Sequence, residues 1–219
     1  MIENNMKKKI FLLFFALGLS YLLLGTNTFN LSKSNEFEKL KDGDIILQTS
    51  QSAQCEAVRI ATNSKFSHCG IIFIDNGKQY VYEAVQPVKI TLLSDWIQHG
   101  EGNNYLVKRL KNSETVLSKI KIDKMKKYAL SLLNKDYDLY FEWSNNKIYC
   151  SEYVWKIYKN GADLELCTLE KLKDFNLKDP KVKAILEERY GKNIPLNEDV
   201  VAPSQLATSP VLETIIDTY

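Results

Sequence analysis

The chain has 219 residues, of which 45% are hydrophobic and 26% are charged, a composition typical of a globular protein with a substantial core. The formal net charge is +2, and residues 1–25 account for all of it, so the remaining chain is neutral. This balance argues against a nucleic-acid-binding surface, and we expect no nucleic acid among the partners. The four cysteines contain no C-x-x-C pair, so we expect neither a metal nor a cofactor.

The N-terminal segment predicts export. Three lysines, Lys7 to Lys9, precede an uncharged, mostly apolar run, Ile10–Gly25, which is the layout of a secretory signal. A buried core helix is the alternative, and the lysines directly before the run argue against it. We therefore expect an extracytoplasmic protein, associated with a membrane through its N-terminus if the segment is retained. The expected division is a signal peptide or membrane anchor at residues 1–25, a linker at 26–41 and one domain at 42–219.

The domain is predicted to be α+β, with a group of strands near its start and helices after it. Strands are predicted where β-branched and aromatic residues follow turn signals, after Asp42-Gly43, at His68–Ile74, at Gln79–Val85 and in "NNYLVKRL". Helices are predicted where apolar residues recur at helical spacing or where caps are recognisable, at Ser52–Asn63, briefly from Ser94, at Asp123–Asn134, at Cys150–Asn160 with Gly161 as the cap, and at Asp179–Gly191.

One predicted hairpin brings together a histidine and a carboxylate. Asn76-Gly77 favours a two-residue turn, and this turn would place Gly70 opposite Glu83. His68 and Glu83 then lie diagonally on one face, with β-carbons roughly 6–8 Å apart, and Gly70 leaves room between them. A carboxylate beside an imidazole orients the ring and supports its charged form, as in hydrolytic triads. A plain surface pair across a hairpin is the alternative at this point.

Cys150 is the candidate nucleophile. It begins a predicted helix, where free backbone N–H groups and the helix dipole lower the pKa of a thiol and can form part of an oxyanion hole. A cysteine at a helix start, packed against a sheet that carries a histidine, is papain-like chemistry. A small buried hydrophobic residue is the alternative interpretation. We predict structural roles for the other three cysteines: Cys55 on an apolar helix face, Cys69 facing away from His68, and Cys167 in a late connection.

These residues resemble a known family, the permuted papain-like amidases (YiiX/YaeF-like hydrolases), which are related to NlpC-type cell-wall peptidases and to lecithin:retinol acyltransferase-like proteins. The resemblance rests on order and spacing over roughly residues 42–210. The matching stretches are "GDIILQTS", "SKFSHCGIIF", "VYEAVQPVKITLLSDWI", "YLVKRL", "YDLYFEWSNNKIYCSEYVWKIY" and "APSQLATSP". It implies a circularly permuted papain-like fold, with an antiparallel sheet packed against helices.

Carried over by motif, the resemblance makes Cys150 the nucleophile, His68 the base and Glu83 the residue that orients the imidazole. In papain the catalytic cysteine precedes the histidine in the chain. Here His68 precedes Cys150, and circular permutation explains the reversed order. Cys69 departs from the aliphatic residue expected beside the histidine. Candidates for polar groups near the thiol are Gln48, Tyr140 and Tyr149, for which ordinary packing is the alternative.

The implied activity is a cysteine hydrolase that cleaves an amide, peptide-like and possibly of the cell wall, through a thioacyl intermediate. The alternatives are a lipid-acting acyl hydrolase or acyltransferase and a non-catalytic binding module on the same fold. A peptidase should show charged groups near the thiol, and a lipid-acting enzyme should show a mostly apolar tunnel there. The expected partner is therefore a peptide or an acyl lipid.

Overall fold

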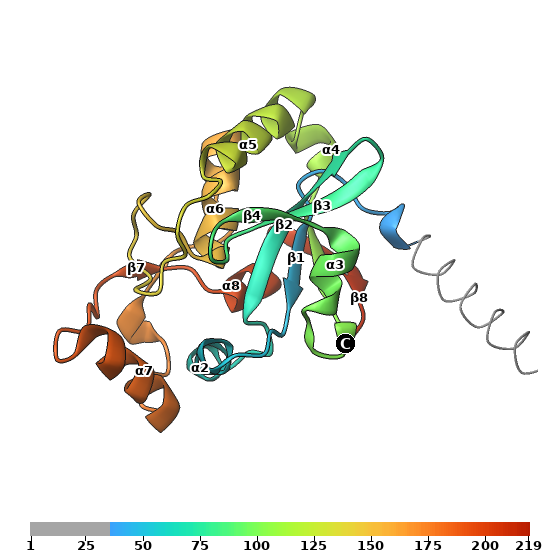
Figure 1. The fold of residues 1–219 in the computed structure, drawn as a ribbon. Coiled ribbons are helices and arrows are strands. Elements are labelled where there is room, and N and C mark those ends of the chain that lie inside the picture. Colours follow the sequence, from blue (N-terminus) through green and yellow to red (C-terminus); the bar gives the residue numbers. More distant parts are fainter. Residues whose placement is uncertain (1–35) are drawn as a thin grey trace, which may run out of the picture. The chain divides into compact units, whose positions relative to one another are not determined.

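The computed structural model describes residues 36–219, and residues 41–219 form one compact unit (Figure 1). The predicted signal peptide or anchor and most of the predicted linker lie outside the described residues. Within the part that the structure describes, no helix combines the length and the apolar character needed to cross a membrane.

A six-stranded antiparallel sheet forms the centre of this unit, with the strand order β4-β3-β2-β1-β5-β8. The strands are β1 (Ile45–Gln48), β2 (His68–Asp75), β3 (Lys78–Glu83), β4 (Lys89–Leu92), β5 (Leu106–Leu110) and β8 (Leu212–Asp217). A separate two-stranded ribbon pairs β6 (Glu170–Lys171) with β7 (Asp199–Val200). Helices accompany this antiparallel sheet, so the predicted α+β class is confirmed.

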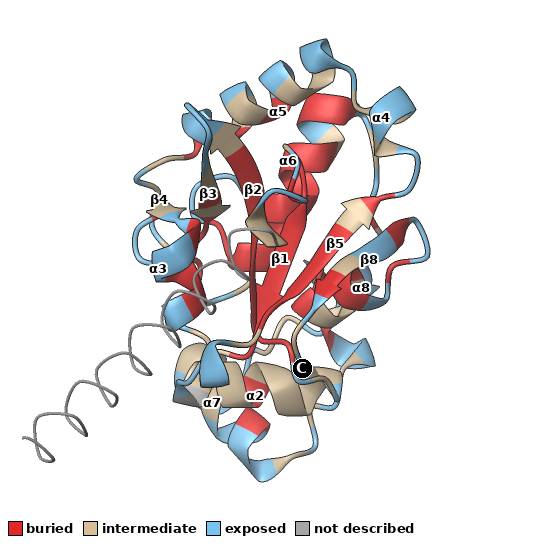
Figure 2. Cartoon of the chain, turned by 90° about the vertical axis from the view of Figure 1, so that its right-hand side faces the viewer, coloured by how far each residue is buried: buried red, intermediate tan, exposed pale blue. Residues whose placement is uncertain are grey.

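Helix α6 packs on the sheet and is itself covered by α5, whereas α3 packs against β3 and β4 (Figure 1). Helices α2 and α7 pack against each other beyond one end of the central strands (Figure 2). Figure 2 also shows that β1 and most of α6 are buried. The helices are α2 (Ala53–Thr62), α3 (Leu93–Gln98), α4 (Ser113–Val116), α5 (Lys119–Ser131), α6 (Cys150–Ala162), α7 (Pro180–Tyr190) and α8 (Pro203–Thr208), with short 3-10 turns η1 (Glu101–Asn103) and η2 (Leu172–Asp174).

The predicted hairpin register is confirmed. Asn76 and Gly77 both have positive φ, 48° and 75°, as a two-residue turn with right-handed strand twist requires. Asp75 pairs with Lys78, and the ladder continues in that register along β2 and β3. His68 and Glu83 therefore end on the same face of the sheet.

Three details differ from the sequence prediction. Helix α5 begins at Lys119, four residues before the predicted start, because the Ser118 side chain caps it. Gly161 lies inside α6, and the left-handed residue that ends this helix is Asp163, with φ of 56°. Strands β4 and β8 were not predicted, although each forms an edge of the central sheet.

Asp44 of the "GDIIL" stretch has a structural role in this fold. It is 1% exposed and accepts two hydrogen bonds of 2.7 Å from the Arg109 guanidinium, which joins the start of β1 to β5. Next to it, the Tyr158 hydroxyl of α6 donates to the Gly43 carbonyl. Burial raises the pKa of Asp44, and the two-point contact with Arg109 opposes that shift.

Gly161 is the point of closest approach between α6 and α5. A β-carbon built there would lie 2.4 Å from Met125 Cγ and 2.5 Å from Met125 Cα, so rotating the methionine side chain cannot remove the clash. Because the helices must separate, we expect Gly161→Ala to lower the free energy of unfolding by about 1–3 kcal/mol, despite the higher helix propensity of alanine. Urea denaturation measures this change. The control Asn160→Ala, at an exposed position of the same helix, should change it by less than about 0.5 kcal/mol.

Candidate active site

Cys150 is the first residue of α6 and is 4% exposed. The preceding residue, Tyr149, has extended backbone and caps the helix, and the Glu152 carboxylate accepts a hydrogen bond from its amide at 3.2 Å. Glu152 is itself fully buried and pairs with Lys156 at 2.7 Å. Burial raises the pKa of Glu152 to about 7. This pair stabilises the first turn of α6, which carries Cys150 at its start.

His68 is the first residue of β2, and Glu83 is the last residue of β3. The His68 Nε2 atom lies 2.6 Å from Glu83 Oε2, and both residues are buried. Glu83 also accepts hydrogen bonds from the Thr91 hydroxyl at 2.5 Å and from the Trp96 indole N–H at 2.9 Å. The Trp96 ring stacks on the His68 ring, with centroids 5.8 Å apart. Glu83 and Trp96 thus fix the orientation of the imidazole and leave its Nδ1 atom for Cys150.

The three predicted residues form one electrostatic unit. Burial alone would lower the pKa of His68, but the hydrogen bonds and charges of Cys150 and Glu83 outweigh it and raise the pKa to about 10. The pKa of Cys150 is well below its usual value, because a hydrogen bond from the Cys69 thiol and the hydrogen bond and charge of His68 outweigh burial. Burial would raise the pKa of Glu83, but the contact with His68 lowers it. Both shifts favour a Cys150 thiolate beside a His68 imidazolium over the neutral pair.

Cys69 faces away from His68, as predicted, but the purely structural role predicted for it is wrong, because its thiol interacts with Cys150. Cys69 does point to the face of the sheet opposite His68, as strand alternation requires. That face, however, is the one on which α6 packs, and Cys69 lies in the same core cluster as Cys150. Its thiol interacts with the Cys150 sulfur, and burial together with that interaction raises the pKa of Cys69 well above the usual value. Cys150 stands at the end of the sheet, where residues from both faces reach it.

Tyr137 is a site residue that the sequence analysis missed. Its hydroxyl interacts with Cys150 and accepts a hydrogen bond from the Gln54 side chain at 3.2 Å. Burial raises the pKa of Tyr137 well above the usual value, so the hydroxyl remains a donor. No local pattern in the sequence shows that the loop before α6 returns to the thiol, so Tyr137 could not be identified from the sequence.

The polar residues named from the sequence have mixed outcomes. Gln48 is the register partner of His68 on β1, and its buried Oε1 atom has no hydrogen-bond partner among the described residues. The Tyr149 hydroxyl instead accepts from the Val201 amide, and Tyr140 is 41% exposed and packs on Tyr190. Gln48 is therefore near the histidine, whereas the Tyr149 hydroxyl and Tyr140 have structural contacts.

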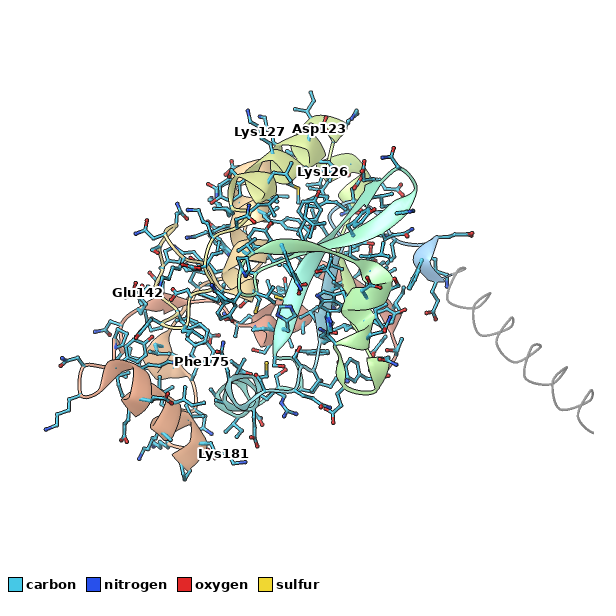
Figure 3. All side chains as sticks on the ribbon, in the orientation of Figure 1. Asp123, Lys126, Lys127, Glu142, Phe175 and Lys181 are labelled. Atoms are coloured by element: carbon cyan, nitrogen blue, oxygen red, sulfur yellow. The ribbon has the colours of Figure 1, made fainter. Side chains whose placement is uncertain are left out.

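An apolar pocket opens beside the thiol. Its walls come from α2, α7, the loop before α6 and the segments before α7 and α8. An ion pair between Lys181 of α7 and Glu56 of α2 joins two of these walls, and Figure 3 labels Lys181 together with the lining residue Phe175. The lining residues include Cys150, Ala57, Val58, Ala61, Phe141, Leu172, Phe175, Leu177, Val182, Ile185, Leu186, Arg189 and Val201.

A second pocket lies on the histidine side of the site, and we call it the polar pocket for its polar lining residues, although much of its wall surface is apolar. His68 and Glu83 line it, as do side chains from β1, α2 and the segment that follows β3. Its polar lining residues are Gln48, Ser50, Ser52, Gln54, Ser67, Gln86, Lys89, His99 and Tyr137. Across the described residues, no group of three or more histidine, cysteine or acidic side chains is arranged to hold a metal ion.

Comparison with known proteins identifies the family and the fold. The family model described as "Permuted papain-like amidase enzyme, YaeF/YiiX" matches residues 39–216. The chain is 46% identical over 173 residues to the uncharacterized protein YiiX of Escherichia coli (strain K12), covering 79% of this chain and 84% of that protein. The crystal structure of metalloprotein yiiX from Escherichia coli O157:H7 is similar with a TM-score of 0.78 and 44% identity, covering 83% of this chain and 99% of that chain. The predicted circularly permuted papain-like fold is confirmed, and the chain belongs to the permuted papain-like amidase family YaeF/YiiX.

Proposed function

We propose that this protein is a cysteine hydrolase that cleaves the amide bond between a long apolar acyl group and an amine. The observation that carries the proposal is the buried arrangement of Cys150, His68 and Glu83, in which Cys150 also lines an apolar pocket. A binding module without turnover would have no need of a thiol with a lowered pKa.

In the first half of the reaction, the Cys150 thiolate attacks the carbonyl carbon and forms a C–S bond. The negative charge moves to the carbonyl oxygen, to which the Cys150 amide and the Tyr137 hydroxyl, which interacts with Cys150, would donate hydrogen bonds. The C–N bond then breaks, and the nitrogen takes the proton from His68 and leaves as an amine. Glu83 holds the ring throughout.

In the second half, water resolves the thioacyl intermediate. His68, now neutral, accepts a proton from the water molecule as its oxygen attacks the acyl carbon. The C–S bond breaks, the carboxylic acid leaves, and the thiolate–imidazolium pair is restored. A lipid acyltransferase would use the same intermediate, with another acceptor in place of water.

The apolar pocket favours an acyl chain over a peptide in the position next to the thiol. Arg189 is the charged residue that lines it, and its guanidinium already donates to the Leu139 carbonyl at 2.7 Å and to the Gln54 side chain at 3.0 Å. These acceptors are neutral, so Arg189 keeps its charge, but the rest of the lining is mainly apolar, and apolar walls stabilise a hydrocarbon chain by about 0.8 kcal/mol per buried methylene. We therefore prefer the acyl-chain substrate to the cell-wall peptide.

The test is hydrolysis of acetyl, octanoyl and dodecanoyl amides of 7-amino-4-methylcoumarin by the full-length protein, followed by fluorescence. We expect kcat/KM to rise at least about tenfold from acetyl to dodecanoyl, because more methylenes are buried. Cys150→Ala should abolish the activity. Ala61→Phe, which fills the apolar pocket, should reduce dodecanoyl hydrolysis more than acetyl hydrolysis. Activity that survives Cys150→Ala, or a preference for the acetyl amide, would contradict the proposal.

Export is part of the proposed function and rests on the sequence of residues 1–25 alone. An alkaline phosphatase fusion to these residues should be active outside the cytoplasm. A fusion in which Lys7, Lys8 and Lys9 are replaced by glutamate should lose most of that activity. Equal activity of the two fusions would argue against an export signal.

A further inference from the structure

The two pockets are lined by different members of the Cys150–His68 pair. Cys150 lines the apolar pocket and His68 does not, whereas His68 and Glu83 line the polar pocket and Cys150 does not. Four residues line both pockets and form the boundary between them: Gln54, Val58, Ser67 and Tyr137. The scissile bond would therefore lie at this boundary.

The chemistry assigns each half of the substrate to one pocket. The acyl carbon becomes bonded to the Cys150 sulfur, so the acyl chain extends on the thiol side. The leaving nitrogen receives its proton from His68 and must lie on the imidazole side. The leaving group therefore extends into the polar pocket, and the groups that line this pocket select it.

In the lining of the polar pocket, basic side chains outnumber acidic ones. Glu83 is the acidic residue in its lining, and its carboxylate already accepts from His68, Thr91 and Trp96. The basic residues in the lining, besides His68, are Lys89 and His99. If the leaving group carried a positive charge in addition to that of its released amine, no free carboxylate among the described residues of this lining could bind that charge.

Lys89 is the residue best placed to meet an anion. It is the register partner of Glu83 on β4, so its side chain projects from the same face of the sheet. Its Nζ atom lies 3.9 Å from Glu83 Oε1, longer than a hydrogen bond, and the side chain is 47% exposed. The Lys89 ammonium therefore lines the polar pocket, is partly exposed to solvent and can contact a bound anion.

We infer that the amine released by this enzyme carries an anionic group, a carboxylate or a phosphate ester, and that Lys89 binds this group. The inference rests on the proposed function, since it describes the leaving group of that reaction. Substrates of this class are N-acyl amino acids and N-acyl phosphoethanolamines. The anion would contact Lys89 at the pocket mouth while the amide nitrogen faces His68.

The experiment compares four amides that share one acyl chain. They are dodecanoyl amides of glycine (carboxylate), phosphoethanolamine (phosphate), glycinamide (neutral) and ethylenediamine (cationic). The full-length protein is incubated with each, and released dodecanoate is measured by mass spectrometry. We expect kcat/KM for at least one anionic amide to exceed that for the neutral amide about fivefold, with the cationic amide lowest. The glycine and phosphoethanolamine amides then show which anion is preferred.

Lys89→Glu is the decisive variant, and Lys78→Glu, at the opposite end of β3 from Glu83, is its matched control. We expect Lys89→Glu to reverse the order, so that the cationic amide becomes better than the anionic ones, whereas Lys78→Glu keeps the wild-type order. If Lys89 only supports Glu83, its replacement will slow all four reactions in proportion and leave the ratios unchanged. That result, or a wild-type preference for the neutral or cationic amide, would overturn the inference.

Failure of the hydrolase proposal and failure of the anion site at Lys89 give different results. If no amide is cleaved, the hydrolase proposal fails, and binding of the four compounds to Cys150→Ala, measured by calorimetry, still tests Lys89. Tighter binding of an anionic compound, reversed by Lys89→Glu, would support the anion site. Equal binding of all four compounds would exclude it.

Discussion

Replacing His68 with alanine is expected to slow the alkylation of Cys150 by iodoacetamide about tenfold near pH 6.5 and to have little effect above about pH 9.5. In the wild-type protein, His68 holds its proton, with a pKa of about 10, and stabilises the thiolate. Without that charge the thiol should return toward or above the usual value of about 8.5, so the thiolate is scarce below that pH and abundant above it. The lower nucleophilicity of a low-pKa thiolate offsets part of the difference, since the Brønsted slope is about 0.4–0.5.

Mass spectrometry of each cysteine across a pH series gives the measurement. Cys55 and Cys167 are internal references, because both are partly exposed and neither is part of the triad. Cys69→Ala separates the contribution of the neighbouring thiol from that of the imidazolium, and we expect a smaller shift from it because a neutral donor stabilises a thiolate less than a full charge does. If Cys150 reacts no faster than Cys167 in the wild-type protein, the ion pair does not exist.

Glu83→Gln is expected to lower kcat/KM by about 10²–10⁴ while the protein remains folded. The amide oxygen of the introduced side chain can keep the hydrogen bonds from His68 and Trp96, and its NH₂ group can donate to Thr91, whose hydroxyl can rotate to accept. The replacement therefore keeps the geometry and removes the charge that helps to raise the pKa of His68. With a less stable imidazolium, the thiolate and the acid that protonates the leaving amine are both less available.

The control for this variant is Glu101→Gln, which removes an exposed carboxylate from η1 and should leave kcat/KM within about twofold. The thermal unfolding midpoint shows whether the Glu83→Gln variant is folded. A folded variant with wild-type activity would mean that Trp96 and the surrounding core orient His68 without the carboxylate. Catalysis would then depend on Cys150 and His68 without Glu83.

The hairpin and the caps could be predicted from the sequence because their signals are local. Asn76-Gly77 determines the turn, and the turn determines the register, so the shared face of His68 and Glu83 follows within a short segment. The N-caps Ser52 and Asp179 likewise mark the starts of α2 and α7. The two edge strands were missed because β4 is short and β8 lies far along the chain from its partner β5, where only tertiary pairing makes it a strand.

By itself, the sequence determined the α+β class, the family resemblance and the residue types of the triad, because caps, turns and strand alternation act over a few residues. Only the tertiary structure decided which distant groups surround the thiol. Cys69 reaches Cys150 because α6 packs on the face of the sheet opposite His68, and Tyr137 reaches it because the loop before α6 folds back. The apolar and polar pockets also depend on this packing, since α2 and α7 come from far apart in the chain. These contacts join segments that are far apart in the sequence. No local pattern of residues predicts them, because they form only when the core packs.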